Sequence, residues 1–238
     1  MKKFLKQMFF GFVSALFILV VFVIFSGCAI LSMKPVKTGK IPGTDIYAVK
    51  NALNSVFFIN TGDSYIMIEA GSDIKKIKTE LGKAGIKPGS VNRIFLTHSD
   101  YDHLAALALF PDAEIYMSEN EFPLINGTVL RNGKKGNSLP AGIDINKIIP
   151  LQNEQEFVFN DTAFKCIEST GHTIGSMSYL VNDKDLFTGD AFSIRKGLPG
   201  IHPFTMDESK AKKTIEQFSE NIFPGKTIYT AHYGYRQF

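Results

Sequence analysis

Four short segments of the chain gather side chains of the types that bind metal ions. They are His98-Ser-Asp-Tyr-Asp-His103, Gly171-His172-Thr-Ile-Gly-Ser176, Thr188-Gly-Asp190 and Thr230-Ala-His232-Tyr-Gly234. Each lies beside an apolar, β-branched run, where a strand would end, and together they contain four of the five histidines. Imidazole and carboxylate groups suit zinc, manganese or iron, and ligands from separate loops leave coordination positions open for water and substrate. The pattern therefore predicts a catalytic metal centre built from several loops.

Short apolar runs ended by turn residues predict the strands that position these segments. A buried strand at residues 93–97 ends directly before His98, and a strand at 227–230 precedes His232. Residues 56–59 and 65–68 are predicted to form a hairpin through the turn at 60–63. Further strands are expected at 114–117, 156–159, 163–167, 177–181 and 186–188, with a tight turn at 182–185.

Three segments have the pattern of helices. Residues 73–84 place apolar side chains at helical spacing before Gly85, and residues 104–110 continue as a helix that Pro111 ends. Residues 207–218 follow Thr205-Met-Asp-Glu208, which is a capping-box pattern. Two β-rich halves, each with helices, predict an α/β fold in which two mixed β-sheets pack face to face with helices outside, an αββα sandwich.

Two irregular stretches flank the predicted site. Residues 123–146 are rich in Gly, Asn and Lys and form either a loop insertion or a flap over the site; within them, Arg131-Asn-Gly-Lys-Lys135 has the composition of a solvated loop. Residues 191–204 follow Asp190 and contain the fifth histidine, His202. Because loops beside a rigid site commonly shape substrate access, His202 is a candidate substrate-binding residue. A packing or surface role is the alternative.

The four segments resemble the metal-binding motifs of the metallo-β-lactamase fold superfamily, in the same chain order. His98, Asp100, Asp102 and His103 fall on its HxHxDH signature, here in the form HxDxDH. The resemblance covers essentially all of residues 41–238 and implies two divalent metal ions, with zinc expected and manganese or iron as alternatives. The implied ligands of the first metal are His98, Asp100 and His172. Those of the second metal are Asp102, His103 and His232, and Asp190 is implied to bridge the two metals.

The resemblance also implies hydrolysis. Two metals roughly 3.5–4 Å apart would hold a bridging hydroxide as the nucleophile and polarise the substrate, with Asp102 managing the proton of the nucleophile. Asp100 stands where most of the family has histidine. Two divalent ions supply four positive charges, and three aspartates with one hydroxide remove all four, so the sequence predicts a neutral cluster. Such a cluster should bind anionic substrates less strongly and make manganese or iron more credible beside zinc.

The substrate class is inferred from the same resemblance. The Asp102-His103 pair looks more like the lactonase, thioesterase and phosphodiesterase branches than like a β-lactamase proper. The prediction is therefore hydrolysis of a small or envelope-associated ester, thioester, lactone or phosphodiester. A binding or accessory protein that keeps the fold without turnover is the alternative, and a β-lactam hydrolase is a third, less favoured one. The net charge of +3, with basic residues scattered among acidic ones, gives no reason to expect nucleic-acid binding.

Residues 1–27 have the pattern of a secretory signal. Lys2, Lys3 and Lys6 precede the apolar run at 8–25, and two small residues stand before Cys28. This resembles the lipobox of bacterial lipoproteins, in which the cysteine is lipidated, although Phe25 replaces the usual leucine. An uncleaved membrane anchor is the alternative. Either way, we expect an exported domain at 41–238, held on the extracytoplasmic side of a membrane through a spacer at 28–40.

Overall fold

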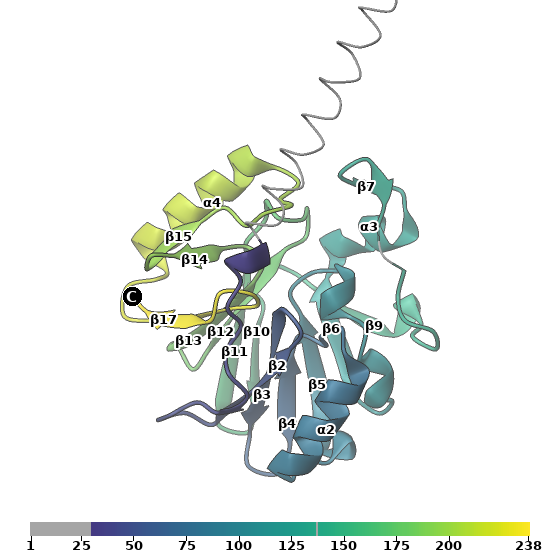
Figure 1. The fold of residues 1–238 in the computed structure, drawn as a ribbon. Helices are drawn as coiled ribbons and strands as arrows, with labels where there is room; N and C mark the ends of the chain where they lie inside the picture. The colour runs from purple at the N-terminus through teal and green to yellow at the C-terminus, as the bar shows by residue number, and fades with distance from the viewer. Residues whose placement is uncertain (1–29, 137) are drawn as a thin grey trace, which may run out of the picture. The chain divides into compact units, whose positions relative to one another are not determined.

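Two mixed β-sheets lie face to face in the part of the chain that the computed structural model describes, residues 30–136 and 138–238 (Figure 1). The first sheet has the strand order β1-β2-β3-β4-β5-β6-β9, and the second has the order β10-β11-β12-β13-β16-β17. Parallel pairs such as β4 with β5 and β13 with β16 stand beside antiparallel pairs in both sheets. The predicted αββα sandwich is confirmed.

The strands and helices have the following bounds. The first sheet contains β1 (Gly39–Lys40), β2 (Ile46–Asn51), β3 (Asn54–Asn60), β4 (Tyr65–Ile68), β5 (Val91–Leu96), β6 (Glu114–Ser118) and β9 (Ile148–Leu151). The second contains β10 (Glu156–Phe159), β11 (Thr162–Glu168), β12 (Met177–Val181), β13 (Asp185–Gly189), β16 (Thr227–Thr230) and β17 (Tyr235–Gln237). Two small hairpins are formed by β7 (Leu130–Arg131) with β8 (Lys134–Lys135) and by β14 (Ser193–Arg195) with β15 (Leu198–Gly200). The helices are α2 (Ile74–Ala84), α3 (Phe122–Asn126) and α4 (Glu208–Asn221), and short 3-10 turns lie at Pro88–Ser90, Tyr101–His103, Leu107–Leu109, Glu119–Glu121 and Ile145–Lys147.

Alternation along the strands builds the layers, because successive side chains of a strand point to opposite faces. On β3, Phe57 enters the layer between the sheets, where its ring meets Phe187 and Tyr229 of the second sheet. Its neighbour Phe58 faces the other way, into the cluster that includes Ile77 of α2. A third cluster packs α4 against the outer face of the second sheet. Helices thus cover the outer face of each sheet (Figure 1).

Both long helices begin at an aspartate. The Asp73 side chain accepts a hydrogen bond from the Lys76 N–H, and Gly85 ends α2 in the left-handed conformation, as the sequence predicts. The cap of α4 is Asp207, whose side chain accepts from the Lys210 N–H. Thr205 is therefore not the cap of this helix.

The predicted helix at 104–110 is wrong. Only the 3-10 turn Leu107–Leu109 forms there. The N–H groups of Ala105 and Ala106 donate to the carbonyls of Gly71 and Ala70. Bonds to a neighbouring segment thus replace part of the i→i−4 ladder that an α-helix requires. Most of its apolar side chains are still buried, among them Leu104, Leu107 and Phe110, so the segment contributes to the core without being a regular helix.

Residues 34–238 form one compact unit, which begins before the predicted boundary at residue 41. The Lys34 N–H donates to the His232 carbonyl, and Val36 is buried. Part of the expected spacer therefore packs in the unit that carries the site. Cys28 and the apolar run at 8–25 lie outside the described residues. Among residues 30–136 and 138–238, no helix is both long and apolar enough to cross a bilayer.

Candidate metal centre

The predicted ligands lie at the carboxyl ends of strands. His98 follows β5, His172 follows β11, Asp190 follows β13 and His232 follows β16. Since β13 and β16 are parallel, Asp190 and His232 leave the second sheet at the same edge. Crevices at the carboxyl ends of strands are common ligand sites in α/β proteins. The structure brings all seven predicted ligands together at this edge.

The first group of donor atoms surrounds Asp100. The Nε2 atoms of His172 and His98 lie 3.2 and 3.5 Å from Asp100 Oδ2. Asp190 Oδ2 lies 3.6 Å from His172 Nε2 and 3.9 Å from His98 Nε2. Two donors bound to one zinc at about 2.0–2.2 Å each can be no more than about 4.4 Å apart. These separations therefore suit one shared metal ion.

The second group lies on the other side of Asp190. His232 Nε2 is 3.3 Å from Asp102 Oδ2 and 3.2 Å from Asp190 Oδ1. His103 Nε2 is 3.7 Å from Asp102 Oδ2 and 3.6 Å from Asp190 Oδ2. The Asp190 carboxylate thus contacts both groups, which is the arrangement that a bridging ligand requires.

Unpaired buried atoms test whether these residues fit a metal ion. His98 Nε2 and Asp190 Oδ1 are buried and have no hydrogen-bond partner among the described residues. A buried polar atom without a partner is costly, so such atoms are uncommon in folded proteins. A divalent cation that accepts nitrogen and oxygen donors would satisfy both. The residues present therefore fit the metal that the sequence predicts.

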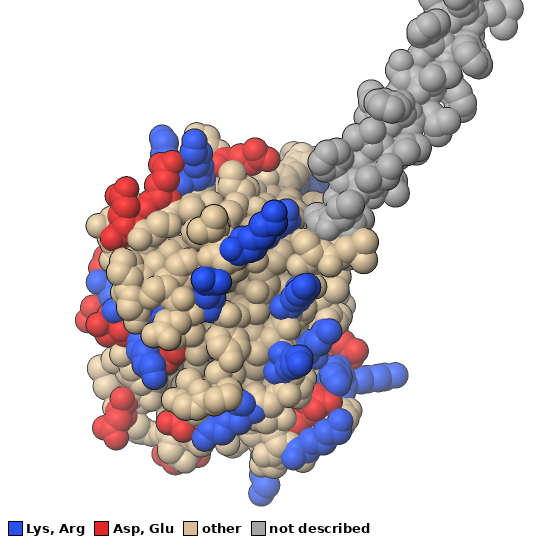
Figure 2. Space-filling model, turned by 60° about the vertical axis from the view of Figure 1, so that its left-hand side comes forward, with Lys and Arg blue, Asp and Glu red and all other residues tan. Residues whose placement is uncertain are grey.

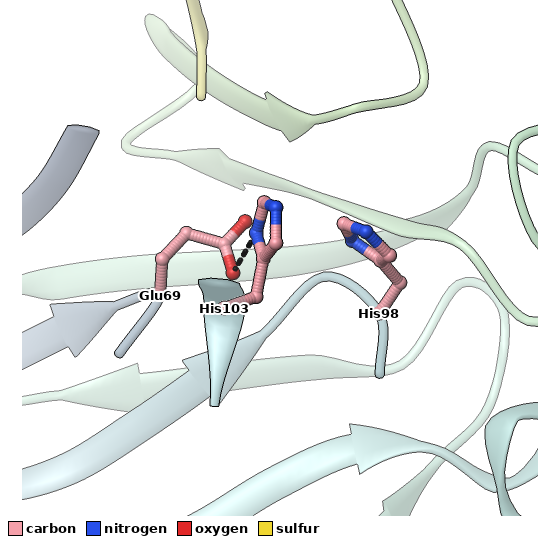
Figure 3. A group of neighbouring side chains, drawn as sticks. All are labelled: Glu69, His98 and His103. Carbon is pink, nitrogen blue, oxygen red and sulfur yellow. Dashed lines mark ion pairs between the residues drawn. The ribbon is translucent and has the colours of Figure 1, made fainter. Parts of the chain in front are cut away.

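Glu69 forms an ion pair with His103 beside the metal ligands (Figure 3). One of its carboxylate oxygens lies 2.9 Å from His103 Nδ1, and the other accepts a hydrogen bond from the Thr97 hydroxyl. Carboxylates in this position commonly orient metal-binding imidazoles. Gly189 makes room for the pair: it has φ +53°, and a Cβ there would collide with the Thr97 hydroxyl and Glu69. Sequence reasoning missed Glu69, although an acid directly after the apolar run of β4 was the available signal.

His232 is oriented by the backbone. Its Nδ1 donates to the carbonyl of Leu53, which leaves Nε2 facing the two aspartates. Since a carbonyl oxygen only accepts, this contact keeps a proton on Nδ1. The Nε2 atom is thereby directed toward the position of the metal.

Glu121 joins two of the ligand-bearing loops. Its buried carboxylate accepts from the N–H of Ser99 at 2.8 Å and from the N–H of Gly175 at 3.0 Å. The hydroxyls of Ser99 and Thr173 donate to it as well. One carboxylate therefore fixes the loop of His98 to the loop of His172. No feature of the sequence pattern singled out this residue.

Arg131 occupies the first group of donors. Its Nε lies 3.1 Å from Asp100 Oδ1 and its Nη2 lies 2.8 Å from Asp100 Oδ2, while Nη2 also lies 3.1 Å from His172 Nε2. Its Nη1 donates to the Phe204 carbonyl. The expectation of a solvated loop is therefore wrong for Arg131, whose side chain is only 11% exposed. Through Arg131, the β7–β8 hairpin thus contacts the site, which agrees with the flap alternative.

Arg131 also changes the charge of the cluster. The prediction of a neutral cluster added the charges of two divalent ions, three aspartates and a hydroxide, and did not include a guanidinium. With Arg131 bonded to Asp100, the same count gives one net positive charge. The expectation that a neutral cluster disfavours anionic substrates therefore does not follow for this chain.

We predict that Arg131→Gln raises the affinity of the first metal position by about tenfold or more, because it removes a positive charge beside a divalent cation. Isothermal titration with Zn²⁺ measures the effect. Lys135→Gln is the matched control, since it removes a cation from the same hairpin but from an exposed position. Equal or weaker zinc binding by Arg131→Gln would mean that the guanidinium orients Asp100 as a ligand and does not compete with the metal.

The ionisation of the aspartates and of His202 suits metal binding. Burial opposes the ionised form of Asp190, but nearby histidines, His202 first, hold its pKa well below the ordinary value. Burial likewise opposes ionisation of Asp102, and His103 and His232 bring its pKa to about 2. Burial lowers the pKa of His202 to about 3, so this imidazole is neutral near neutral pH. Neutral imidazole and ionised carboxylate are the forms that ligate metals.

His232 carries a proton that a metal would displace. Burial alone would lower the pKa of His232, but Asp190 and Asp102 outweigh burial and raise it to about 10. The pKa of His103 shifts in the same direction: Glu69, Asp102 and Asp190 raise it well above the ordinary value despite burial. Metal binding at the second group therefore releases protons, since an imidazole must lose its Nε2 proton before it ligates.

Known proteins are similar to this chain in sequence and in fold. The chain is 25% identical over 175 residues to a probable polyketide biosynthesis zinc-dependent hydrolase, PksB, of Bacillus subtilis, covering 71% of this chain and 67% of that protein. It is 33% identical over 102 residues to a hydroxyacylglutathione hydrolase of Glaesserella parasuis, covering 41% of this chain and 34% of that protein. Among solved structures, BJP-1, a subclass B3 metallo-beta-lactamase of Bradyrhizobium japonicum, matches with a TM-score of 0.63 and 19% identity over 86% of this chain and 81% of that one.

The structural likeness is evidence for the fold alone, because its sequence identity is low. The family is shown by sequence: residues 49–232, which include all seven predicted ligands, match the model of the metallo-beta-lactamase superfamily. The relatives named as zinc-dependent or metallo-hydrolases agree with this match. The chain therefore belongs to the metallo-beta-lactamase superfamily.

Proposed function

We propose that this metal-dependent hydrolase binds two divalent metal ions and cleaves an ester, thioester, lactone or phosphodiester. The observation that carries the proposal is the position of Asp190, whose carboxylate lies within 3.9 Å of Nε2 atoms in both groups of donors. Each group also has an aspartate of its own, Asp100 or Asp102. Two metals that share one carboxylate suit this arrangement better than one metal would.

The residues of the site have different roles in metal binding and in proton transfer. When bound, two divalent metals supply an activated water and polarise the substrate oxygen. His98, Asp100 and His172 hold the first metal position, while Asp102, His103 and His232 hold the second. The Asp102 side chain is 38% exposed, against 22% for Asp100 and 5% for Asp190. We assign to Asp102 the further role of orienting the attacking water and accepting its proton, because it is the most accessible carboxylate of the set.

Zinc is the proposed metal. The named zinc dependence of PksB supports it, and the four histidines among the seven ligands suit it as well. Manganese and iron are the alternatives, because Asp100 adds an oxygen donor to the first group.

A second candidate function is a binding or accessory role without turnover. Arg131 favours it, because its guanidinium bonds to the atoms of Asp100 and His172 that the first metal would use. Hydrolysis of β-lactams is a third, less favoured candidate. The solved structures of subclass B3 enzymes share the fold with this chain, and this likeness does not assign their substrate to it.

One assay separates these candidates. The full-length chain, purified in detergent and loaded with zinc, manganese or iron, is tested on aryl esters, thioesters, lactones, phosphodiesters and a chromogenic β-lactam. We expect metal-dependent hydrolysis of at least one member of the first four classes, abolished by a chelator. Metal binding without hydrolysis of any of them would favour the binding role, and cleavage of the β-lactam alone would favour the third candidate.

We further propose that the domain is exported and held at the extracytoplasmic face of a membrane, where it acts on a small-molecule or envelope-associated substrate. The support is the sequence of residues 1–28, which lie outside the described residues. No nucleic-acid partner is expected. On the face drawn in Figure 2, basic side chains are spread out, with acidic ones among them toward the edges.

Lipidation of Cys28 is tested by Cys28→Ser. The variant should block processing, because the residue that receives the lipid is lost, and leave a precursor that retains residues 8–25. Mass spectrometry of the N-terminus compares the variant with the wild type. A mature wild-type protein that still contains residues 8–25 would replace the lipoprotein proposal with an uncleaved anchor.

A further inference from the structure

His202 is a buried imidazole that the proposed ligand set leaves unused. Its side chain is 2% exposed, and its Nε2 has no hydrogen-bond partner among the described residues. Buried polar atoms are nearly always paired in native structures, so an unpaired one calls for an explanation. A simple packing role does not supply one, because an apolar ring would pack as well.

Both ring nitrogens of His202 are unpaired, and one of them, Nε2, faces the metal centre. Its Nε2 lies 3.6 Å from Asp190 Oδ2, which is longer than the roughly 2.7–3.2 Å of a hydrogen bond between nitrogen and oxygen. The ring stands between those of His172 and His232, with centroids 4.9 and 5.2 Å away. One donor atom each of Asp190, His202 and His232 lies within 4.8 Å of the other two. The same 3.6 Å suits two donors that share one metal at about 2.0–2.2 Å each.

The chain holds His202 in this place from two sides. The Thr205 hydroxyl donates to the His202 carbonyl at 2.7 Å, and the Met206 N–H donates to the carbonyl of His172 at 3.1 Å. On the other side of the ring, the Tyr233 ring lies 5.7 Å away at nearly a right angle. The loop after β15 is thus bonded to a ligand-bearing loop, and the imidazole is buried with its Nε2 toward Asp190.

We propose that His202 is an additional protein ligand of the second metal, the one held by Asp190 and His232. This rests on the proposed dinuclear site. The second position then has five protein donors, which are Asp102, His103, Asp190, His202 and His232. Zinc sites in proteins commonly use three or four protein donors, so a fifth strengthens the manganese or iron alternative to zinc at this position.

Cobalt(II) binding tests this assignment, because its visible absorption strengthens as the number of donors falls. The full-length chain in detergent is compared with His202→Phe, which keeps an aromatic ring against its neighbours but removes both nitrogens. Tyr233→Phe is the control, since it removes only the hydroxyl that contacts Arg195. We expect His202→Phe to bind one cobalt ion about 10–100-fold more weakly or worse, as the loss of even a supporting residue does, with stronger absorption from that ion. Tyr233→Phe should match the wild type.

Unchanged cobalt affinity and absorption in His202→Phe would overturn the assignment while leaving the metal-dependent hydrolase intact. A wild-type chain that binds no metal would overturn both. If His202→Phe fails to fold, ¹⁵N-histidine NMR of the wild type with zinc decides the question. All five imidazoles should then show the shift of a coordinated nitrogen, and an unshifted His202 would contradict the proposal.

Discussion

Asp190→Ala is expected to empty the metal centre and to abolish hydrolysis. Its two carboxylate oxygens lie 3.2–3.6 Å from His232, His103 and His172, so the substitution removes a donor from both metal positions at once. Loss of a residue that merely supports a ligand weakens metal binding by about 10–100-fold, and loss of a shared ligand should exceed that at both positions. Elemental analysis after gel filtration gives the metal content, and the substrate panel gives the activity.

Two further variants make this experiment specific. His172→Ala removes a ligand of the first position only, so it should keep the second metal and lose less metal than Asp190→Ala. Asp185→Asn removes a carboxylate from β13, the strand that Asp190 follows; there Asp185 accepts a hydrogen bond from Tyr229. It should keep both metals. If Asp190→Ala retains the metal content of Asp185→Asn, the carboxylate does not bridge and the dinuclear proposal fails.

The fold could be predicted because local pattern and tertiary structure agree along most of the chain. The run at 93–97 reads as a buried strand, and β5 (Val91–Leu96) is one. The turn predicted at 182–185 also forms: Asn182 and Asp183 both have positive φ, and β13 begins at Asp185. The prediction failed at residues 104–110, where the apolar spacing was correct but hydrogen bonds to Gly71 and Ala70 replaced the helical ones. Those partners lie more than thirty positions earlier in the chain, so no local sequence pattern predicts them.

Local pattern also identifies the metal ligands, whereas the residues that support them are defined by long-range contacts. His98 and Asp190 are identified by residue type and by their place directly after strands. Glu121 and Arg131 belong to common residue types, and their roles depend on contacts with residues far away in sequence. Arg131 meets Asp100 31 positions away, and Glu121 meets Thr173 52 positions away. Only the folded chain reveals such partners, which is why the charge of the site was miscounted from sequence.

Glu121→Ala is expected to destabilise the fold and to loosen two ligand loops together. It leaves the buried N–H groups of Ser99 and Gly175 without their acceptor. Since an unsatisfied buried donor costs about 1–3 kcal/mol, we expect a loss of about 3 kcal/mol or more. For a domain of this size, 3 kcal/mol lowers Tm by about 6–12 °C. Thermal unfolding of the metal-free and zinc-loaded chain by circular dichroism measures both the loss and its dependence on metal.

Its control comes from the same turn. Glu119→Ala removes an exposed acid from Glu119–Glu121, and a surface change of this kind should alter stability by no more than about 0.5 kcal/mol. Glu121→Gln should fall between the two, because its side-chain oxygen can still accept from one of the loops. Zinc should also stabilise Glu121→Ala less than the wild type, since the loops of His98 and His172 are no longer held at the same separation. If Glu121→Ala unfolds at the same temperature as Glu119→Ala and binds zinc equally well, the four hydrogen bonds to Glu121 do not position the metal ligands.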